Sequence, residues 1–409
     1  MKYSRLILFT LISVILTDIH RKLGAVGSIN LDSGTSIATI LNYSSIAVLI
    51  FLAWKVGFEK NETPQAIRYL FSLWVLWNIL SVIRGSFFAE DYWDWKAILL
   101  YSLAFSFIPM TFFLGRNIDF AKIVFRFVIT ILFPFGFILI PLAFVSSIEL
   151  YSRIMIPVGL FIVFLPFLKY RWKLLVVIVA ATSILVVIGF RSNIIKIAFS
   201  VGLIFIYYLR NFMPRITLRF LQIFLFALPV VLLVLAVSGG YNIFSDIGDQ
   251  EGYTTISSSG EVQNLMADTR TGLYRDVLAT MEQSENWLMG EGAGGRYQTE
   301  RFDYLGDGRG RYGSEVGILN ILLYHGLIGV SIYFLLLFTV SYYAIRQSNN
   351  TLAQLLGLYI AFRWTYSFVE EFTSYDLNFY FFWITVGLVS STRFREMSND
   401  DIKQYLELR

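Results

Sequence analysis

The sequence predicts an all-α integral membrane protein with about twelve transmembrane helices and one large extracytoplasmic loop. The first observation is composition: 56% of the 409 residues are hydrophobic and only 15% are charged, whereas soluble domains have about 25% charged residues. The second is a hydrophilic stretch from Gly239 to Gly313 with apolar segments on both sides. Loops above about 12–15 residues are usually functional or disordered. Because this stretch shows helical periodicity, we expect it to hold the functional site.

The apolar segments have the length that a bilayer crossing requires, which is about 20 residues in a helix. Several cores are short and must extend into flanking residues. The expected cores before the loop are Leu6–Thr17, Ser36–Trp54, Ile67–Ile83, Ala97–Leu114, Ile123–Val145, Ile154–Leu168, Leu174–Phe190, Ile194–Leu209 and Phe220–Val237. Those after it are Leu327–Ile345, Leu352–Val369 and Leu377–Val389. Arg191, Ser192 and Asn193 alone separate the seventh core from the eighth, which indicates a tight turn.

The expected organisation has four parts. Residues 1–238 hold transmembrane helices 1–9, residues 239–313 form the external loop with short helices, residues 314–392 hold helices 10–12, and residues 393–409 form a cytoplasmic tail. Lysine and arginine set the orientation, because they concentrate on the cytoplasmic side. With a cytoplasmic N-terminus, the inner segments hold more than half of all lysines and arginines, and the short external segments hold few, among them Arg84, Arg191 and Lys196. We therefore expect both termini inside and the loop outside.

Composition also excludes several classes of site. The chain has no cysteine and only two histidines, His20 and His325, so we expect no disulfide, no thiolate metal site and no multi-histidine metal site. His325 is expected to be a packed or interfacial residue. The glycine run Gly290–Gly295 lacks the Lys-Ser/Thr ending of a phosphate-binding P-loop. Acidic residues outnumber basic ones in the loop, so it is not a nucleic-acid surface. No cofactor and no metal are expected.

A helix is expected from about Thr269 to Ser284, with Asp268 or Thr269 as its cap. Arg270 and Arg275 on this helix diverge by about 140° at 3.6 residues per turn. They cannot point the same way. One of them is free to bind substrate while the other pairs with Asp276 or another acid, and for each a solvated surface position is the alternative.

Two further charges lie at the expected external ends of apolar segments. Arg191 at the external end of a span is either a snorkelling arginine or an anchor for an anionic lipid headgroup, since its planar donor fork suits phosphate oxygens. Glu315 opens an apolar segment that runs into the tenth span. It is either an acid at a helix N-terminus or a partly buried carboxylate that serves as a general base.

The eleventh span carries charges of its own, Arg363 and Glu370, followed by Glu371. Arg363 and Glu370 are seven residues apart, so a continuous helix places them on one face about two turns from each other. A charge inside a span is a functional hypothesis by default. The alternative is a structural ion pair that steadies the bundle.

Four motifs in this order resemble the O-antigen polymerase and ligase superfamily, the bacterial membrane glycosyltransferases of the Wzy and WaaL kind. They are Ile188–Ile195 with its arginine at a span end, Thr269–Leu278 with an arginine four residues before an aromatic, Leu288–Gly292 with Gly-x-Gly, and Leu319–Gly329 at the entry into the next span. The matching region runs from about residue 186 to 345. The ligases carry a His-Asn pair where this chain has Ser314-Glu315-Val316, and this difference favours a polymerase.

The resemblance implies a fold like that of the GT-C type membrane glycosyltransferases, in the bacterial inner membrane with the loop in the periplasm. It implies transfer of a growing glycan from undecaprenyl pyrophosphate to an incoming lipid-linked repeat unit, without a metal and with inversion. The implied partners are the lipid-linked donor and acceptor, membrane lipid and a polysaccharide chain-length regulator. The alternatives are a ligase of the same superfamily and a twelve-helix secondary transporter, which needs its essential charges near the bilayer midplane.

Site residues follow from this mechanism. Fixed arginines stabilise the charge that builds on the leaving pyrophosphate, and a carboxylate accepts the proton of the acceptor hydroxyl. The expected catalytic residues are Arg191, Arg270 and Glu315. The expected substrate-binding residues are Arg275, Arg296, Tyr274, Tyr312, Arg363 and Glu370. Aromatic residues of the loop are expected to stack on sugar faces, namely Tyr274, Trp287, Tyr297, Phe302, Tyr304 and Tyr312.

Overall fold

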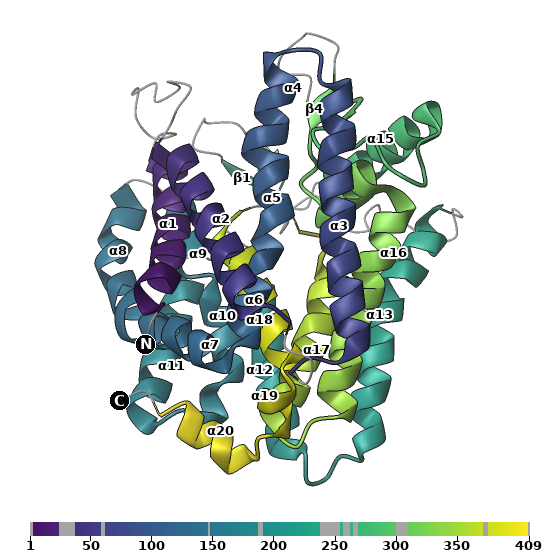
Figure 1. Ribbon diagram of the computed structural model, residues 1–409. Helices are drawn as coiled ribbons and strands as arrows, with labels where there is room; N and C mark the ends of the chain where they lie inside the picture. The colour runs from purple at the N-terminus through teal and green to yellow at the C-terminus, as the bar shows by residue number, and fades with distance from the viewer. Residues whose placement is uncertain are drawn as a thin grey trace.

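The computed structural model describes residues 3–23, 37–58, 62–145, 148–186, 191–237, 254–256, 262–264, 269–299, 310–370 and 375–407. Helices dominate this part and run in a bundle (Figure 1). One end of the bundle carries α15 (Thr269–Ser284) and the junction between α3 and α4, and we call it the α15 end. The opposite end carries α20 (Asn399–Tyr405), and we call it the α20 end.

The first helices are α1 (Ser4–Leu23), α2 (Ile37–Val56), α3 (Gln65–Phe88), α4 (Tyr92–Ala97), α5 (Leu103–Phe107), α6 (Phe112–Arg116), α7 (Ile118–Phe127), α8 (Phe133–Val145), α9 (Ile148–Ile154) and α10 (Pro157–Val163). They are followed by α11 (Tyr170–Val186), α12 (Arg191–Leu209), α13 (Arg215–Val237), α15, α16 (Gly317–Arg346), α17 (Thr351–Tyr366), α18 (Leu377–Ser390), α19 (Thr392–Glu396) and α20. Short π or 3-10 turns lie at Ile98–Ser102, Ile108–Thr111, Val128–Leu132 and Leu165–Phe167.

Seven helical stretches of the described residues are long and apolar enough to cross a membrane. They are Ile37–Val56, Gln65–Phe88, Tyr92–Arg116, Ile118–Pro141, Ser192–Leu209, Ile216–Leu235 and Gly317–Arg346. The membrane class is therefore confirmed, but the expected count of about twelve is not. The sixth expected core is divided between α9, α10 and a 3-10 turn, with Pro157 starting α10. The last two expected cores form helices of only 16 and 14 residues, α17 and α18.

The core of the bundle lies around α18, whose residues from Leu377 to Ser390 are all buried. It packs against α6, α16 and α17, and Phe71 of α3 reaches it through Trp383 at a ring distance of 5.9 Å. A helix that is apolar on every side can be buried on every side. The shortness of α18 therefore reflects its place inside the protein.

The described residues between α13 and α16 form α15 and two short antiparallel strand pairs. One pairs β1 (Thr254–Ile256) with β2 (Val262–Asn264), and the other pairs β3 (Arg296–Tyr297) with β4 (Arg311–Tyr312). The helix expected from Thr269 to Ser284 is confirmed with the same bounds. The tight turn expected at Arg191–Asn193 is wrong, because these residues form the first turn of α12. Residues 187–190 before it lie outside the described part.

The most consequential irregularity is a break in α16 at Gly326, whose φ of 63° and ψ of −169° divide the helix into two halves. A loop from Trp287 to Glu291 fills the break. The amide of Glu291 donates to the Leu323 carbonyl at 2.6 Å, and the Leu327 amide donates to the Trp287 carbonyl at 2.8 Å. Backbone groups freed by a break inside a membrane protein need such partners. The loop therefore supplies some of the backbone hydrogen-bond partners that a continuous α16 would have provided.

Helix α3 supplies further partners to the break from one of its faces. Trp77 Nε1 donates to the His325 carbonyl at 2.9 Å, and Ser81 Oγ donates to the Tyr324 carbonyl at 2.7 Å. One turn further along, the two terminal nitrogens of Arg84 donate to the carbonyls of Met289 and Gly290, each at 2.6 Å. Residues spaced by three and four lie on one helical face. The same face thus holds α16 and the inserted loop.

The break predicts that replacing Gly326 with any larger residue destabilises the protein. A Cβ there would lie 2.3 Å from the Leu288 carbonyl oxygen, on a backbone of positive φ. We expect Gly326→Ala to cost at least about 1–3 kcal/mol and to lower the unfolding temperature in detergent. The matched control is Gly202→Ala in α12, where a Cβ meets nothing within 4 Å and alanine favours the helix by up to about 1 kcal/mol. Equal unfolding temperatures for the two variants would contradict the account.

Candidate functional site

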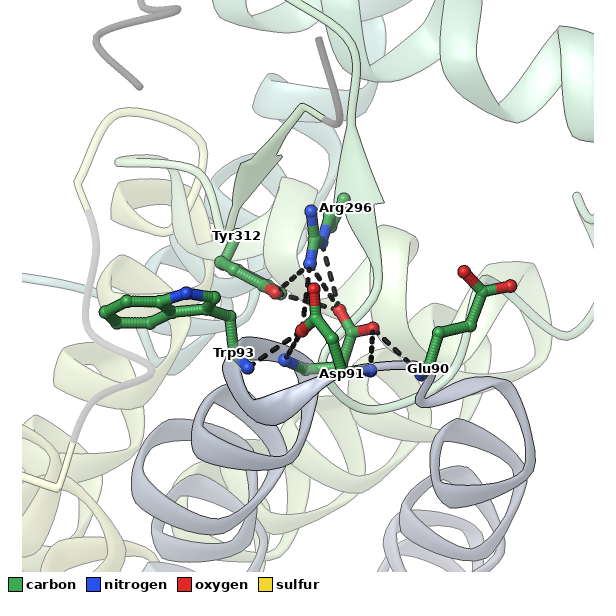
Figure 2. A network of polar contacts seen from close by, with 6 residues as sticks. Glu90, Asp91, Trp93, Arg296 and Tyr312 are labelled. Carbon is green, nitrogen blue, oxygen red and sulfur yellow. Dashed lines mark hydrogen bonds and ion pairs between the residues drawn. The ribbon is translucent and has the colours of Figure 1, made fainter. Parts of the chain in front are cut away.

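Arg296 and Tyr312 face each other across the β3–β4 pair and bind the N-terminus of α4 (Figure 2). Arg296 donates to Asp94 Oδ1 through Nη2 at 2.6 Å and through Nε at 3.1 Å. Tyr312 donates to the same oxygen at 2.8 Å and accepts a hydrogen bond from Arg296. Asp91 caps α4 and lies 3.8 Å from Arg296 Nη2. The hairpin is therefore clamped to α4 by charge-assisted bonds.

The clamp favours the protonated form of the Tyr312 phenol. Burial raises the pKa of Tyr312, and the hydrogen bond to Asp94 raises it further. Tyr312 therefore stays a protonated donor at neutral pH. Arg296 and Tyr312 are the predicted substrate-binding residues that the structure brings together, and the carboxylates they contact here belong to the protein itself. Their role toward substrate remains a prediction.

A polar pocket of about 540 Å³ adjoins the clamp between the α3–α4 junction and the glycine-rich loop. Its lining combines carboxylates, amides, one guanidinium and one aromatic ring, contributed by Glu90, Asp94, Glu291, Asn286, Gln298, Arg296 and Phe88. Such a mixture of hydrogen-bonding groups beside a ring suits a ligand rich in hydroxyl groups. Sequence reasoning missed the carboxylates of α4, because they lie outside the predicted loop.

A second feature of the α15 end is a buried ion pair between Lys196 and Glu370. Lys196 Nζ lies 2.7 Å from Glu370 Oε1, and the two side chains are 1% and 14% exposed. The charge count assigned Lys196 to an external segment, although the expected core Ile194–Leu209 includes it, and the structure places it in α12 within the apolar stretch that starts at Ser192. The other oxygen, Glu370 Oε2, has no hydrogen-bond partner among the described residues.

Three more polar residues complete what we call the buried charge cluster: Lys196, Arg363, Glu370, Asp376 and Asn378. Arg363 is 1% exposed and donates to Asn378 Oδ1 at 2.7 Å. Asp376 is buried and caps α18 by accepting from the Phe379 amide at 2.8 Å. The expected sharing of one helical face by Arg363 and Glu370 is wrong, since α17 ends at Tyr366 and Glu370 lies beyond it. Glu371 lies outside the described residues.

The segment that carries Glu370 is held by α15 and by α16. Tyr274 of α15 donates to the Phe368 carbonyl at 2.7 Å. At the start of α16, the Gly317 amide donates to the Glu370 carbonyl at 3.1 Å, and the Ile318 amide donates to the Ser367 carbonyl at 3.0 Å. The hydroxyl of Tyr274, predicted to bind substrate, thus anchors α15 on the segment that carries Glu370.

The structure describes only one of the three predicted catalytic side chains, that of Glu315. Glu315 was expected to be either an acid at a helix N-terminus or a partly buried base, and its side chain is 59% exposed and lies 3.1 Å from Arg311 Nη2. The partly buried alternative is therefore wrong, because the chain turns this side chain outward one residue before the buried segment begins. Arg191 is the first residue of α12 and Arg270 the second of α15. Their side chains lie outside the described part of the structure.

Other predicted residues have clear positions. Arg275 is 71% exposed with its Nε 3.9 Å from Asp276 Oδ1, as expected for one of the two arginines of α15. His325 is packed, with its ring 5.5 Å from that of Trp74 and 5.7 Å from that of Phe105. Phe302 and Tyr304, expected to stack on sugars, lie outside the described residues.

The clamp predicts a contrast between two loop arginines. Arg296→Ala removes charge-assisted bonds worth about 1.5–3 kcal/mol and leaves Asp94 partly buried without its cation. Arg275→Ala removes an exposed contact and should change stability by no more than about 0.5 kcal/mol. Thermal unfolding followed by tryptophan fluorescence measures both. A loss of stability in the Arg275 variant that matches or exceeds that in the Arg296 variant would refute the clamp.

The chain was compared with protein-family models, with curated proteins and with solved structures, and nothing matches in any of the three comparisons. The residues of the α15 end therefore carry the functional conclusion.

Proposed function

We propose that the protein is a membrane glycosyltransferase, a polysaccharide polymerase of the Wzy kind. It moves a growing glycan from undecaprenyl pyrophosphate to a sugar hydroxyl of an incoming lipid-linked repeat unit at the outer face of the bacterial inner membrane. The anomeric carbon–oxygen bond to pyrophosphate breaks, the new glycosidic bond forms, and the acceptor proton passes to a carboxylate. The resemblance of the four sequence motifs is the starting point for this proposal.

The observation that carries the proposal is the position of the buried charge cluster. Lys196 lies near the start of α12, Glu370 lies past the end of α17, and Asp376 caps the start of α18. All three therefore lie at helix ends, where α15 packs on the bundle through Tyr274. A reaction on the headgroup of a lipid requires charges near the membrane surface, and charges gathered at helix ends beside α15 are compatible with that requirement.

The contacts of Lys196 and Glu370 support a separate role for each in the proposed reaction. Lys196 is a fixed cation in a buried site, and Arg191 starts the same helix, so the start of α12 suits the developing charge on a leaving pyrophosphate. Glu370 keeps one carboxylate oxygen without a partner among the described residues, whereas Glu315 is exposed and paired with Arg311. We therefore assign the general base to Glu370 in place of Glu315. The polar pocket beside Arg296 suits the glycan.

A secondary transporter is the second candidate, and the same ion pair favours it. A buried lysine and glutamate between apolar helices are typical of ion or proton pathways. Transporters place such groups near the bilayer midplane, so the position of this ion pair relative to the bilayer separates the two candidates. A ligase of the same superfamily differs only in its acceptor, a lipid A–core in place of a second repeat unit.

The decisive assay uses purified protein in nanodiscs with one undecaprenyl-pyrophosphate-linked repeat unit and separates the products by length. We expect a ladder of lipid-linked multimers. Transfer only after lipid A–core is added would identify a ligase. No transfer to either acceptor, with the repeat unit verified, would overturn the proposal in favour of the transporter.

Substitutions of the ion pair separate a catalytic role from a structural one. Lys196→Met alone should lower stability by about 3–5 kcal/mol, because it leaves Glu370 buried without its cation. The double variant Lys196→Met with Glu370→Met removes both charges and should recover most of this stability. We expect its ladder to remain at least about 100-fold weaker than that of the native protein.

Glu315→Gln is the matched control for the loss of a carboxylate, and it should keep most of the activity. Native-like polymerisation by the stable double variant would show that the ion pair is structural, and the roles of Lys196 and Glu370 would be withdrawn. Loss of activity in Glu315→Gln with full activity in Glu370→Gln would return the base to Glu315.

A further inference from the structure

A pocket of about 740 Å³ opens at the α20 end of the bundle, far along the helices from the charge cluster. It lies between the α12–α13 connection, the α16–α17 connection and α19. Its polar lining consists mainly of three arginines and neutral amides with a single acid, including Arg210, Arg219, Arg346, Asn211, Asn349 and Glu396. We propose that this pocket binds the anionic phosphate headgroup of a lipid from the adjacent membrane leaflet.

Two of the three arginines are held in position by neighbouring groups, and no described carboxylate neutralises any of the three. Arg210 Nη1 donates to the Tyr207 carbonyl at 2.7 Å, and its guanidinium lies 4.0 Å from the centre of the Tyr207 ring. The guanidinium of Arg346 lies 4.5 Å from the centre of the Tyr342 ring. Among the described residues, no carboxylate forms an ion pair with Arg210, Arg219 or Arg346. Aromatic contacts thus orient guanidinium groups whose remaining N–H donors suit phosphate oxygens.

The opposite wall of the pocket is held in place by hydrogen bonds between the α16–α17 connection and α19. Asn350 caps α17 by accepting from the Ala353 amide at 2.8 Å and donates to the Phe394 carbonyl at 2.9 Å. The Asn349 amide donates to the Arg395 carbonyl at 2.8 Å, and Arg395 Nη1 donates to the Gln347 carbonyl at 3.1 Å. Bonds between the α16–α17 connection and α19 therefore fix the amides that line the pocket. A preformed site loses less entropy on binding.

The surroundings of the pocket favour a lipid over a soluble phosphate. Large apolar side chains of α12, α13 and their connection are exposed beside it, with Phe212 at 86%, Phe220 at 68% and Ile216 at 63%. These residues alternate along the chain with the lining residues Arg210, Pro214 and Arg219. An acyl chain can follow the apolar surface while its headgroup enters the pocket. Basic pockets between transmembrane helices bind anionic headgroups in this manner.

The test uses the full-length protein, delipidated in detergent, with phosphatidylglycerol, phosphatidylcholine or inorganic phosphate added. We measure the unfolding temperature and the number of lipids retained in native mass spectrometry. We expect phosphatidylglycerol to raise the unfolding temperature and to stay bound, and zwitterionic phosphatidylcholine and inorganic phosphate to have much smaller effects. The double variant Arg219→Gln with Arg346→Gln should require at least about tenfold more phosphatidylglycerol for the same shift, because tenfold corresponds to about 1.4 kcal/mol.

The control variant Arg126→Gln with Arg171→Gln removes the same charge from two exposed arginines that do not line the pocket. It should respond to phosphatidylglycerol like the native protein. If the pocket variant does not purify as a single species, Arg346→Lys, which keeps the charge but loses the donor fork, tests the same contact. Equal responses of pocket and control variants would overturn the proposal. Equal protection by inorganic phosphate alone would assign the pocket to a soluble phosphate and overturn the lipid.

Discussion

The break in α16 at Gly326 is the constraint on which the α15 end depends. A helix interrupted among apolar neighbours leaves carbonyl and amide groups that must find partners. Here the loop around Gly290 and one face of α3 provide them, with Arg84 bonded to the loop. Gly290 has a φ of 73°, and a Cβ on it would lie 2.6 Å from the Gly326 amide nitrogen. Two glycines in close contact thus fix where the loop after α15 enters the bundle.

The two polar features of the α15 end follow from this insertion. Beyond the glycine loop the chain reaches Arg296, which is clamped to Asp94 of α4, and the polar pocket lies between them. The first half of α16 begins on the segment that holds Glu370, through the Gly317 amide. The glycine loop and α16 therefore connect the polar pocket with the buried charge cluster, an arrangement that suits the proposed reaction between two lipid-linked glycans.

Local signals in the sequence were sufficient for part of this structure. The helix Thr269–Ser284 was predicted from its cap and its apolar side, and the packed state of His325 from its apolar surroundings. Glycine motifs were found, but their mutual contact was not, because sequence spacing does not reveal tertiary partners. The partner of Arg296 lies 202 positions away, and that of Lys196 lies 174 positions away. Charge counting assigned Lys196 to an external segment even though it lies in the expected core Ile194–Leu209, because such counting does not see the carboxylate of Glu370 that pairs with it.

The central claim is that the charges at the α15 end act on a lipid pyrophosphate. The most direct measurement is a cryo-EM structure of the protein in nanodiscs with undecaprenyl pyrophosphate bound. The account predicts pyrophosphate density at the start of α12, within hydrogen-bonding distance of Lys196. Density for the pyrophosphate elsewhere in the molecule, with the start of α12 unoccupied, would contradict it.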